Sequence, residues 1–214
     1  MHISDGVLPT TIALGSYAAA TAIAAWSVRK TAADDLPKVA VVTSSFFVAS
    51  LVHVPLGPTS VHLLIPGLIG ILLRQSAFVS ILLGLLLQSL LFQFGGITAL
   101  GANALLMGIP ALTCGFLFSR IRGTTLQNHV AAAAFCGGLG TALAALFLAL
   151  FLAAGGDDFS GVAKIALAAH LPVIIIESIL SAFTVSFLFK VKPDLLGPGF
   201  FQTEPSVTVD ESAC

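Results

Sequence analysis

The chain has 214 residues, of which 57% are hydrophobic and 9% are charged, with a formal net charge of −1. Ordinary soluble domains carry about 25% charged residues, so this composition excludes a soluble globular domain and predicts an integral membrane protein. The near-neutral charge, without a basic stripe, gives no support for binding to nucleic acid.

The first six residues are polar and are expected to form a metal-chelating segment. No Lys or Arg precedes Arg29, so the segment does not resemble a signal peptide, and the large His2 favours retention of Met1. The Met1 amine, the Met1–His2 amide nitrogen and the His2 ring can close two adjacent chelate rings on one metal ion. Such tetragonal nitrogen coordination suits Ni(II) or Cu(II) above all. It leaves one position for an imidazole from elsewhere in the chain.

Two other interpretations of this segment stay open. His2 can be the second residue of a frayed terminus, since chain termini are commonly disordered. Asp5 can either orient His2 or cap the turn at Gly6, and we favour orientation.

Seven apolar segments follow and are expected to be transmembrane helices. They cover residues 7–28, 39–51, 62–73, 77–94, 95–122, 130–154 and 162–189. The second and third are short, and the third, which contains Pro66 and Gly67, is expected either to kink or to belong partly to the preceding loop. The expected architecture is an all-α integral membrane protein with about seven transmembrane helices, in one polytopic domain over residues 1–192. Residues 193–214 are polar and are expected to form a cytoplasmic tail.

The stretch from His53 to His62 interrupts the second and third segments. Its Pro55, Gly57 and Pro58 cannot continue a helix cheaply. At membrane depth such backbone survives only where protein buries it or it lines a cavity, and transporters tend to place binding sites in broken segments. The flanking histidines make this a second candidate ligand region. His53 itself can be a partner of a metal ligand, a pH-sensitive gate, or a histidine hydrogen-bonded at a helix end.

Polar side chains inside apolar segments need partners, because an unpaired polar group is costly there. Asn103 is therefore expected to face the protein interior, and Thr98 is expected to cap the helix that follows it. His129 opens the sixth segment and is expected at the inner membrane interface.

His170 and Glu177 are seven residues apart, two helical turns, so they can share one face of the seventh helix. An intramembrane carboxyl group is a functional-site hypothesis by default. A structural hydrogen bond to Asn103, Gln88 or Gln93 is an equally good interpretation, and the roles of both residues stay open.

The positive charges predict an orientation. With seven spans and an outside N-terminus, the inner loops and tail hold Arg29, Lys30, Lys38, Arg74, Arg120, Arg122, Lys190 and Lys192. Only Lys164 then lies outside, so eight of the nine cationic residues obey the positive-inside rule. This orientation brings residues 1–6, the 53–62 break and the 95–103 turn together at the outer face.

Three motifs follow one another along the chain: Met1-His2-Ile3-Ser4-Asp5-Gly6, Gly57-Pro58-Thr59-Ser60-Val61-His62-Leu63-Leu64 and Gly95-Gly96-Ile97-Thr98-Ala99-Leu100-Gly101-Ala102-Asn103. Together they resemble the CbiM/NikM family, the substrate-capture components of energy-coupling factor importers for cobalt and nickel. The resemblance covers essentially the whole chain, and it implies seven spans with the amino end outside.

The resemblance also implies a metal held by a square-planar set of nitrogens from Met1, His2 and a distal histidine. The match of Thr59-Ser60-Val61-His62 to the family's threonine-serine-x-histidine segment gives the distal role to His62. The residues expected to support these ligands are His53, Asp5, Ser60 and Asn103. The extra His53 matches the pattern of neither metal firmly, so nickel and cobalt both stay open.

The partners implied by the resemblance are a CbiQ/NikQ-like coupling subunit, CbiO/NikO-like ATPase subunits and a small CbiN/NikN/NikL-like accessory subunit, in the inner (plasma) membrane. The chain has no Walker-type loop and no serine–histidine–acid set, so we expect no enzyme activity and no catalytic cofactor. Ni(II) or Co(II) is expected as transported substrate. The alternative is a membrane metal sensor or a scaffold subunit without transport activity, which copurification with an ATPase distinguishes.

Overall fold

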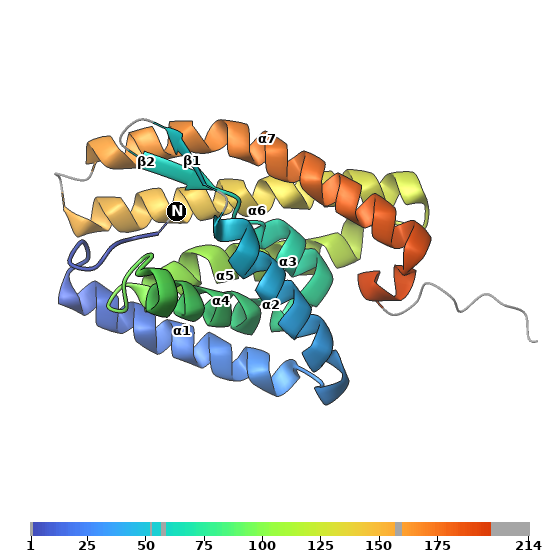
Figure 1. The fold of residues 1–214 in the computed structure, drawn as a ribbon, viewed down its shortest axis with the longest axis horizontal. Coiled ribbons are helices and arrows are strands. Elements are labelled where there is room, and N and C mark those ends of the chain that lie inside the picture. Colours follow the sequence, from blue (N-terminus) through green and yellow to red (C-terminus); the bar gives the residue numbers. More distant parts are fainter. Residues whose placement is uncertain (1, 52, 57–58, 157–159, 198–214) are drawn as a thin grey trace, which may run out of the picture.

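The computed structural model of the chain describes residues 2–51, 53–56, 59–156 and 160–197, with the backbone alone for 53–56, 59–62 and 160. In this part of the chain the helices are α1 (Thr10–Lys30), α2 (Leu36–Leu51), α3 (Pro66–Leu73), α4 (Ala77–Phe92), α5 (Leu100–Ile121), α6 (Leu126–Gly155) and α7 (Ser160–Val191). A hairpin of β1 (His53–Leu56) and β2 (Thr59–His62) lies between α2 and α3, and the helices pack as one elongated bundle (Figure 1).

Five stretches of the described chain are long and apolar enough to cross a membrane: Thr10–Lys30, Pro66–Phe92, Leu100–Ile121, Leu126–Gly155 and Gly161–Val191. The predicted helical, multi-pass architecture is confirmed, but seven full-length spans are not. At 1.5 Å per residue, the 16 residues of α2 reach about 24 Å and the 8 residues of α3 about 12 Å. Both fall short of the hydrocarbon core of about 30 Å, because the Pro- and Gly-containing stretch between them leaves the helical conformation.

The chain reverses between α3 and α4. Arg74 has a left-handed φ of 51° and lies against Gly115 of α5. Phe78, four residues later, already lies against Gly108, so α4 turns back along α5. The long apolar stretch that contains both helices is therefore a helical hairpin, and its first arm, α3, contacts both α5 and α6.

The predicted irregular stretch after α2 is in fact an antiparallel hairpin. Its register pairs His53 with His62 and Pro55 with Ser60. Inter-strand pairing satisfies backbone groups that helix breakers have freed, and a proline is tolerated in a strand whose other edge is not part of a larger sheet. The two histidine backbones consequently stand opposite each other where the hairpin joins the helices.

The connections between the helices lie at two opposite ends of the bundle. Figure 1 shows the N-terminal segment, the hairpin and the α4–α5 turn at one end of the bundle, and the α1–α2 and α5–α6 connections at the other. The segments that the charge pattern predicted to gather therefore do lie at one end.

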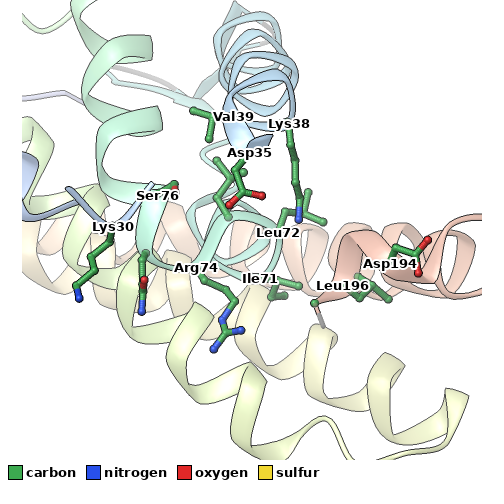
Figure 2. Close-up of a pocket in the computed structure, with 13 residues that line it drawn as sticks. Lys30, Asp35, Lys38, Val39, Ile71, Leu72, Arg74, Ser76, Asp194 and Leu196 are labelled. Carbon is green, nitrogen blue, oxygen red and sulfur yellow. The ribbon is translucent and has the colours of Figure 1, made fainter. Parts of the chain in front are cut away.

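The opposite end carries positive charge. Lys30, Lys38 and Arg74, from three different helix ends, surround a cavity of about 310 Å³ together with Asp35 and Asp194 (Figure 2). The α1–α2 connection, beside this cluster, lies at the end of the bundle opposite the hairpin and the α4–α5 turn (Figure 1).

The same end also holds part of the predicted tail. Pro193–Leu196 forms a 3-10 turn, and its carbonyls accept hydrogen bonds from side chains of the helices. Lys38 donates to Leu195 at 2.7 Å and Arg122 donates to Leu196 at 2.6 Å. Residues 193–196 are therefore held against α2 and α5, the predicted boundary at residue 192 stays a prediction, and residues 198–214 lie outside the described chain.

Candidate metal centre

Asn103 of α5 fixes the backbone of the N-terminal segment. Its side-chain oxygen accepts the N–H of Ile3 at 2.8 Å, and its amide nitrogen donates to the carbonyls of Ile3 at 3.0 Å and Gly95 at 3.3 Å. Ile3 and Asn103 are 1% and 2% exposed, so losing such a bond would cost about 1–3 kcal/mol. The prediction that Asn103 is buried and paired is confirmed, and its partner is the residue next to His2.

Asp5 makes a second attachment, two residues after Ile3. Thr98 donates to Oδ1 of Asp5 from its backbone N–H at 2.8 Å and from its hydroxyl. The bond from the hydroxyl holds the pKa of Asp5 below its ordinary value. The predicted cap at Thr98 is wrong, because this hydroxyl is engaged by Asp5 and α5 begins at Leu100 without a side-chain cap. The proposed orientation of His2 by Asp5 stays a prediction.

The His2 ring packs against the turn that follows α4. It stacks on Phe94, with ring centroids 6.5 Å apart and planes within 13°. Both of its ring nitrogens are shielded from solvent. Together with the bonds of Ile3 and Asp5, this arrangement contradicts the interpretation of residues 2–5 as a frayed end and holds an imidazole at a fixed place.

Gly95 and Gly96 allow the N-terminal segment to approach the α4–α5 turn. Their φ values of +82° and +70° are in the left-handed region that favours glycine. A Cβ on Gly95 would lie 2.9 Å from the Asn103 amide nitrogen and 3.0 Å from the His2 Cβ, and one on Gly96 would meet the Asp5 carboxyl group. Both glycines are therefore required by close approach as well as by conformation.

Replacing Gly95 by alanine is expected to loosen the N-terminal segment. Overpacking costs about 1–3 kcal/mol, so amide exchange at Ile3 should accelerate by about fivefold or more. Gly6→Ala is the matched control, because Gly6 has the same φ of +82° and a Cβ at this position would meet nothing within 4 Å. Hydrogen-exchange mass spectrometry of both variants checks this, and equal acceleration in the two would show that backbone strain rather than contact matters.

The second predicted ligand region is β2. Its backbone places His62 opposite His53 and Ser60 opposite Pro55. Met1 and the side chains of His53, Ser60 and His62 lie outside the described part of the chain, so their predicted roles stay predictions.

Glu177 of α7 anchors the chain where it leaves β2. Its Oε1 accepts the N–H groups of Leu64 at 2.6 Å and Ile65 at 2.9 Å, and its Oε2 accepts the hydroxyl of Thr141 on α6. The carboxyl group is almost fully buried. A structural hydrogen bond was one of the two interpretations of Glu177, but among the described residues its partners are not those expected, namely Asn103, Gln88 and Gln93.

Two further histidines, His129 and His170, lie in α6 and α7. His170 is buried, with Nδ1 in contact with the Ala166 carbonyl at 2.6 Å. His129, in the first turn of α6, is fully buried against Phe118 and Phe189, and its predicted place at the inner membrane interface stays a prediction. Within the described residues no three His, Cys, Asp or Glu side chains gather as a metal cluster, so a site built from internal side chains alone gains no support.

Comparison with known families agrees with these features. Residues 2–195 match the family model described as CbiM, cobalt uptake substrate-specific transmembrane region. The chain belongs to the CbiM family. The resemblance inferred from the sequence motifs is confirmed, and with it the assignment to cobalt and nickel transport, to multi-pass membrane proteins and to a class that is not enzymatic.

Relatives of this CbiM chain match over nearly its whole length. A putative metal transport protein of Haemophilus influenzae is 35% identical over 199 residues, covering 92% of this chain and 97% of that protein. A putative fused nickel transport protein NikMN of Archaeoglobus fulgidus is 31% identical over 203 residues, covering 92% and 68%. The crystal structure of a truncated transition metal transporter has a TM-score of 0.75 at 26% identity, covering 89% of this chain and 99% of that one.

Some groups that pack around the two candidate ligand segments had no clear sequence signal. The N–H groups of Leu64 and Ile65 belong to the backbone, and Thr141 lies in an apolar segment with nothing to connect it to Glu177. Tyr17 is the exception, since it is the chain's single tyrosine and lies in an apolar segment. A tyrosine hydroxyl in such a place usually finds a partner, and Tyr17 donates to the Ile97 carbonyl in the α4–α5 turn.

Proposed function

We propose that this CbiM chain is the membrane substrate-binding component of an ATP-driven importer of the energy-coupling factor type, and that it captures Ni(II) or Co(II). The observation that carries the proposal is the attachment of Ile3 to the buried Asn103, which fixes the backbone next to His2. A nitrogen chelate formed by a chain terminus needs a backbone held in this way, since an unrestrained terminus must lose its conformational freedom when it binds.

The proposed coordination set is square-planar. Met1, as the mature amino terminus, supplies its amine, His2 supplies its amide and ring nitrogens, and His62 supplies the fourth nitrogen. A deprotonated amide in a tetragonal set favours Ni(II) somewhat over Co(II), and Cu(II) would bind more strongly than either. Metal supply therefore contributes to selectivity along with the site. The residues proposed to support the ligands are Asp5, Asn103, Ser60 and His53.

The proposed orientation places the site at the outer face of the inner (plasma) membrane. The cationic ends of the helices gather at the other end of the bundle, around the cavity of Figure 2. The positive-inside rule assigns that end to the cytoplasm. The N-terminal segment and the hairpin then face outwards, where an imported ion arrives.

The proposed transport cycle needs other subunits. Family resemblance implies a CbiQ/NikQ-like coupling subunit and CbiO/NikO-like ATPases that hydrolyse ATP. The relative from Archaeoglobus fulgidus is by name a fused NikMN protein, of which this chain covers 68%. This supports a separate small subunit of the CbiN or NikN kind as a further partner.

Acidification is expected to release the metal while the N-terminal segment stays attached. Bound nitrogens must be unprotonated, and ordinary values are about 6.5 for histidine and about 7.7–8.0 for the α-amine. Asp5 responds at a lower pH, because its pKa in the folded protein lies below its ordinary value of about 3.9. Its bonds to Thr98 therefore contribute fully to stability above that ordinary value, and the contribution is lost only as the pH falls through the lower folded pKa. Between neutral and mildly acidic pH, the protein should therefore lose its bound metal while the amides of residues 2–5 stay protected from hydrogen exchange. Loss of metal and of amide protection at the same pH would contradict this.

Radioactive nickel and cobalt test the proposed function directly. Purified protein should bind the ions without ATP, and cells should accumulate them only when the coupling and ATPase subunits are coexpressed. His62→Ala should remove both activities. Binding that persists unchanged in His62→Ala would refute the proposed ligand set, and binding without any accumulation in the complete system would favour a sensor or scaffold.

A further inference from the structure

Glu177 is a buried carboxyl group in the middle of α7, a long apolar helix. Such a group is expensive inside a membrane and is retained where it has partners or a task. Its two oxygens meet three donors from two other parts of the chain, namely the N–H groups of Leu64 and Ile65 and the hydroxyl of Thr141. Glu177 is 1% exposed, so these bonds form out of contact with water.

The two N–H donors converge because the chain turns sharply at this point. Ile65 adopts the left-handed conformation, with φ 45° and ψ 30°, immediately before α3 begins at Pro66. This conformation is unfavourable for a β-branched residue. Successive N–H groups in such a turn form a concave donor site for an oxygen atom, and Oε1 of Glu177 occupies it. The carboxyl group therefore stabilises a turn that the local sequence disfavours.

The turn lies next to the proposed distal ligand. β2 ends at His62, and Leu64, two residues later, is fully buried and bonded to Glu177. A linker this short leaves the backbone of His62 little freedom relative to α7. Contacts of β2 with α7 and α2 are consistent with the hairpin being held against both helices.

The two ligand-bearing segments thus have separate anchors on different helices. Asn103 of α5 holds the segment that contains His2, and Glu177 of α7 holds the segment that contains His62. Metal sites require their ligands to be held within about 0.5 Å of the productive geometry. The distance between these two anchors therefore determines whether a fourth nitrogen can reach a metal bound by the first three.

We propose that Glu177 is a positioning residue for metal capture, which places His62 opposite the amino-terminal chelate through the backbone of Leu64 and Ile65. The proposal rests on the proposed function, because it assigns a task to an anchor of a ligand-bearing strand. It concerns the position of the oxygen atom that accepts the two N–H groups, and the charge on the carboxyl group has no part in it.

Glu177→Gln and Glu177→Asp separate position from charge. Glutamine keeps an acceptor oxygen at the same distance from the helix, and its amide can donate to Thr141, whose hydroxyl is already within 3.4 Å of the Gly137 carbonyl. Aspartate keeps the acid but withdraws it by one methylene group. Positioning predicts near-wild-type affinity for Ni(II) in Glu177→Gln and a loss of about 10–100-fold in Glu177→Asp, the range typical of residues that support metal ligands.

Thr141→Val is the matched control for buried hydrogen bonding. It removes the partner of Oε2 and leaves both N–H bonds of Oε1 in place, so it should lower the thermal midpoint without lowering metal affinity. The d–d absorption of bound Ni(II) provides a second readout, because loss of the fourth nitrogen in Glu177→Asp should change the square-planar spectrum. His62→Ala in the same assays tests the proposed function independently.

The outcomes differ for each alternative. If Glu177→Gln loses affinity for Ni(II) while Glu177→Asp keeps it, the charge of the carboxyl group is what matters, and the proposal is overturned. Equal affinity in both variants, with His62→Ala inactive, would show that Glu177 only stabilises the fold and would also overturn it. Weak binding in Glu177→Asp with normal binding in Glu177→Gln and Thr141→Val supports it. Full binding in His62→Ala would instead refute the proposed ligand set.

Discussion

Replacing His2 by alanine is expected to lower the affinity for Ni(II) and Co(II) by more than about 100-fold, because even residues that only support metal ligands are worth 10–100-fold. The substitution removes the ring nitrogen that completes the terminal chelate. The bonds of Ile3 to Asn103 do not involve the His2 ring, so the segment should remain attached. Competition with a chromogenic metal indicator at neutral pH gives the dissociation constants.

Ser4→Ala is the matched control for His2→Ala. Ser4 is an exposed residue of the same segment, and its substitution keeps the terminal amine, the amide and the His2 ring. It should bind metal as the wild type does. Retention of full affinity in His2→Ala would mean that the metal is held elsewhere.

Replacing Asn103 by leucine is expected to release the N-terminal segment as a whole. The change leaves the N–H and carbonyl of Ile3 unpaired in a site that is 1% exposed. Each unsatisfied buried group costs about 1–3 kcal/mol, so the metal affinity should fall at least about tenfold and the thermal midpoint should also fall. Titration calorimetry and hydrogen exchange at residues 2–5 measure the two consequences.

Thr113→Val on the same helix controls for a general effect on α5. Its hydroxyl is exposed and bonds to the Ile109 carbonyl within the helix at 2.9 Å, so its loss should leave metal binding intact. Rapid exchange at Ile3 in Asn103→Leu without any loss of affinity would show that attachment of the segment is not needed for binding.

Much of the bundle follows from simple patterns in the sequence. Apolar length and low charge predicted a helical multi-pass protein, and the distribution of cations predicted which segments share an end of the bundle. Asn103 was recognised as a buried, paired residue because an amide in an apolar helix has few alternatives. Its partner could not be predicted, because the donor and acceptor of Ile3 are backbone groups that every residue carries.

The remaining features depend on tertiary contacts. The sequence showed that the second and third segments are short, at 13 and 12 residues. It did not show that β1 and β2 pair between them, since pairing of the backbone leaves no mark on the composition. Thr98 is a residue type that commonly caps helices, but its hydroxyl donates a hydrogen bond to Asp5, 93 residues away. Glu177 was a candidate for a structural bond, yet its partners lie 112 and 113 residues away in a left-handed turn that its own bonds support.

Insertion of one alanine between Met1 and His2 tests the central claim most directly. The insertion retains every side chain and the bonds of the segment to Asn103 and Thr98, but it enlarges the chelate ring and displaces the terminal amine. We expect binding of Ni(II) and Co(II) to purified protein to collapse, as it should in His62→Ala. Unchanged binding would contradict coordination by the terminus and would direct attention to His53, His170 and Glu177.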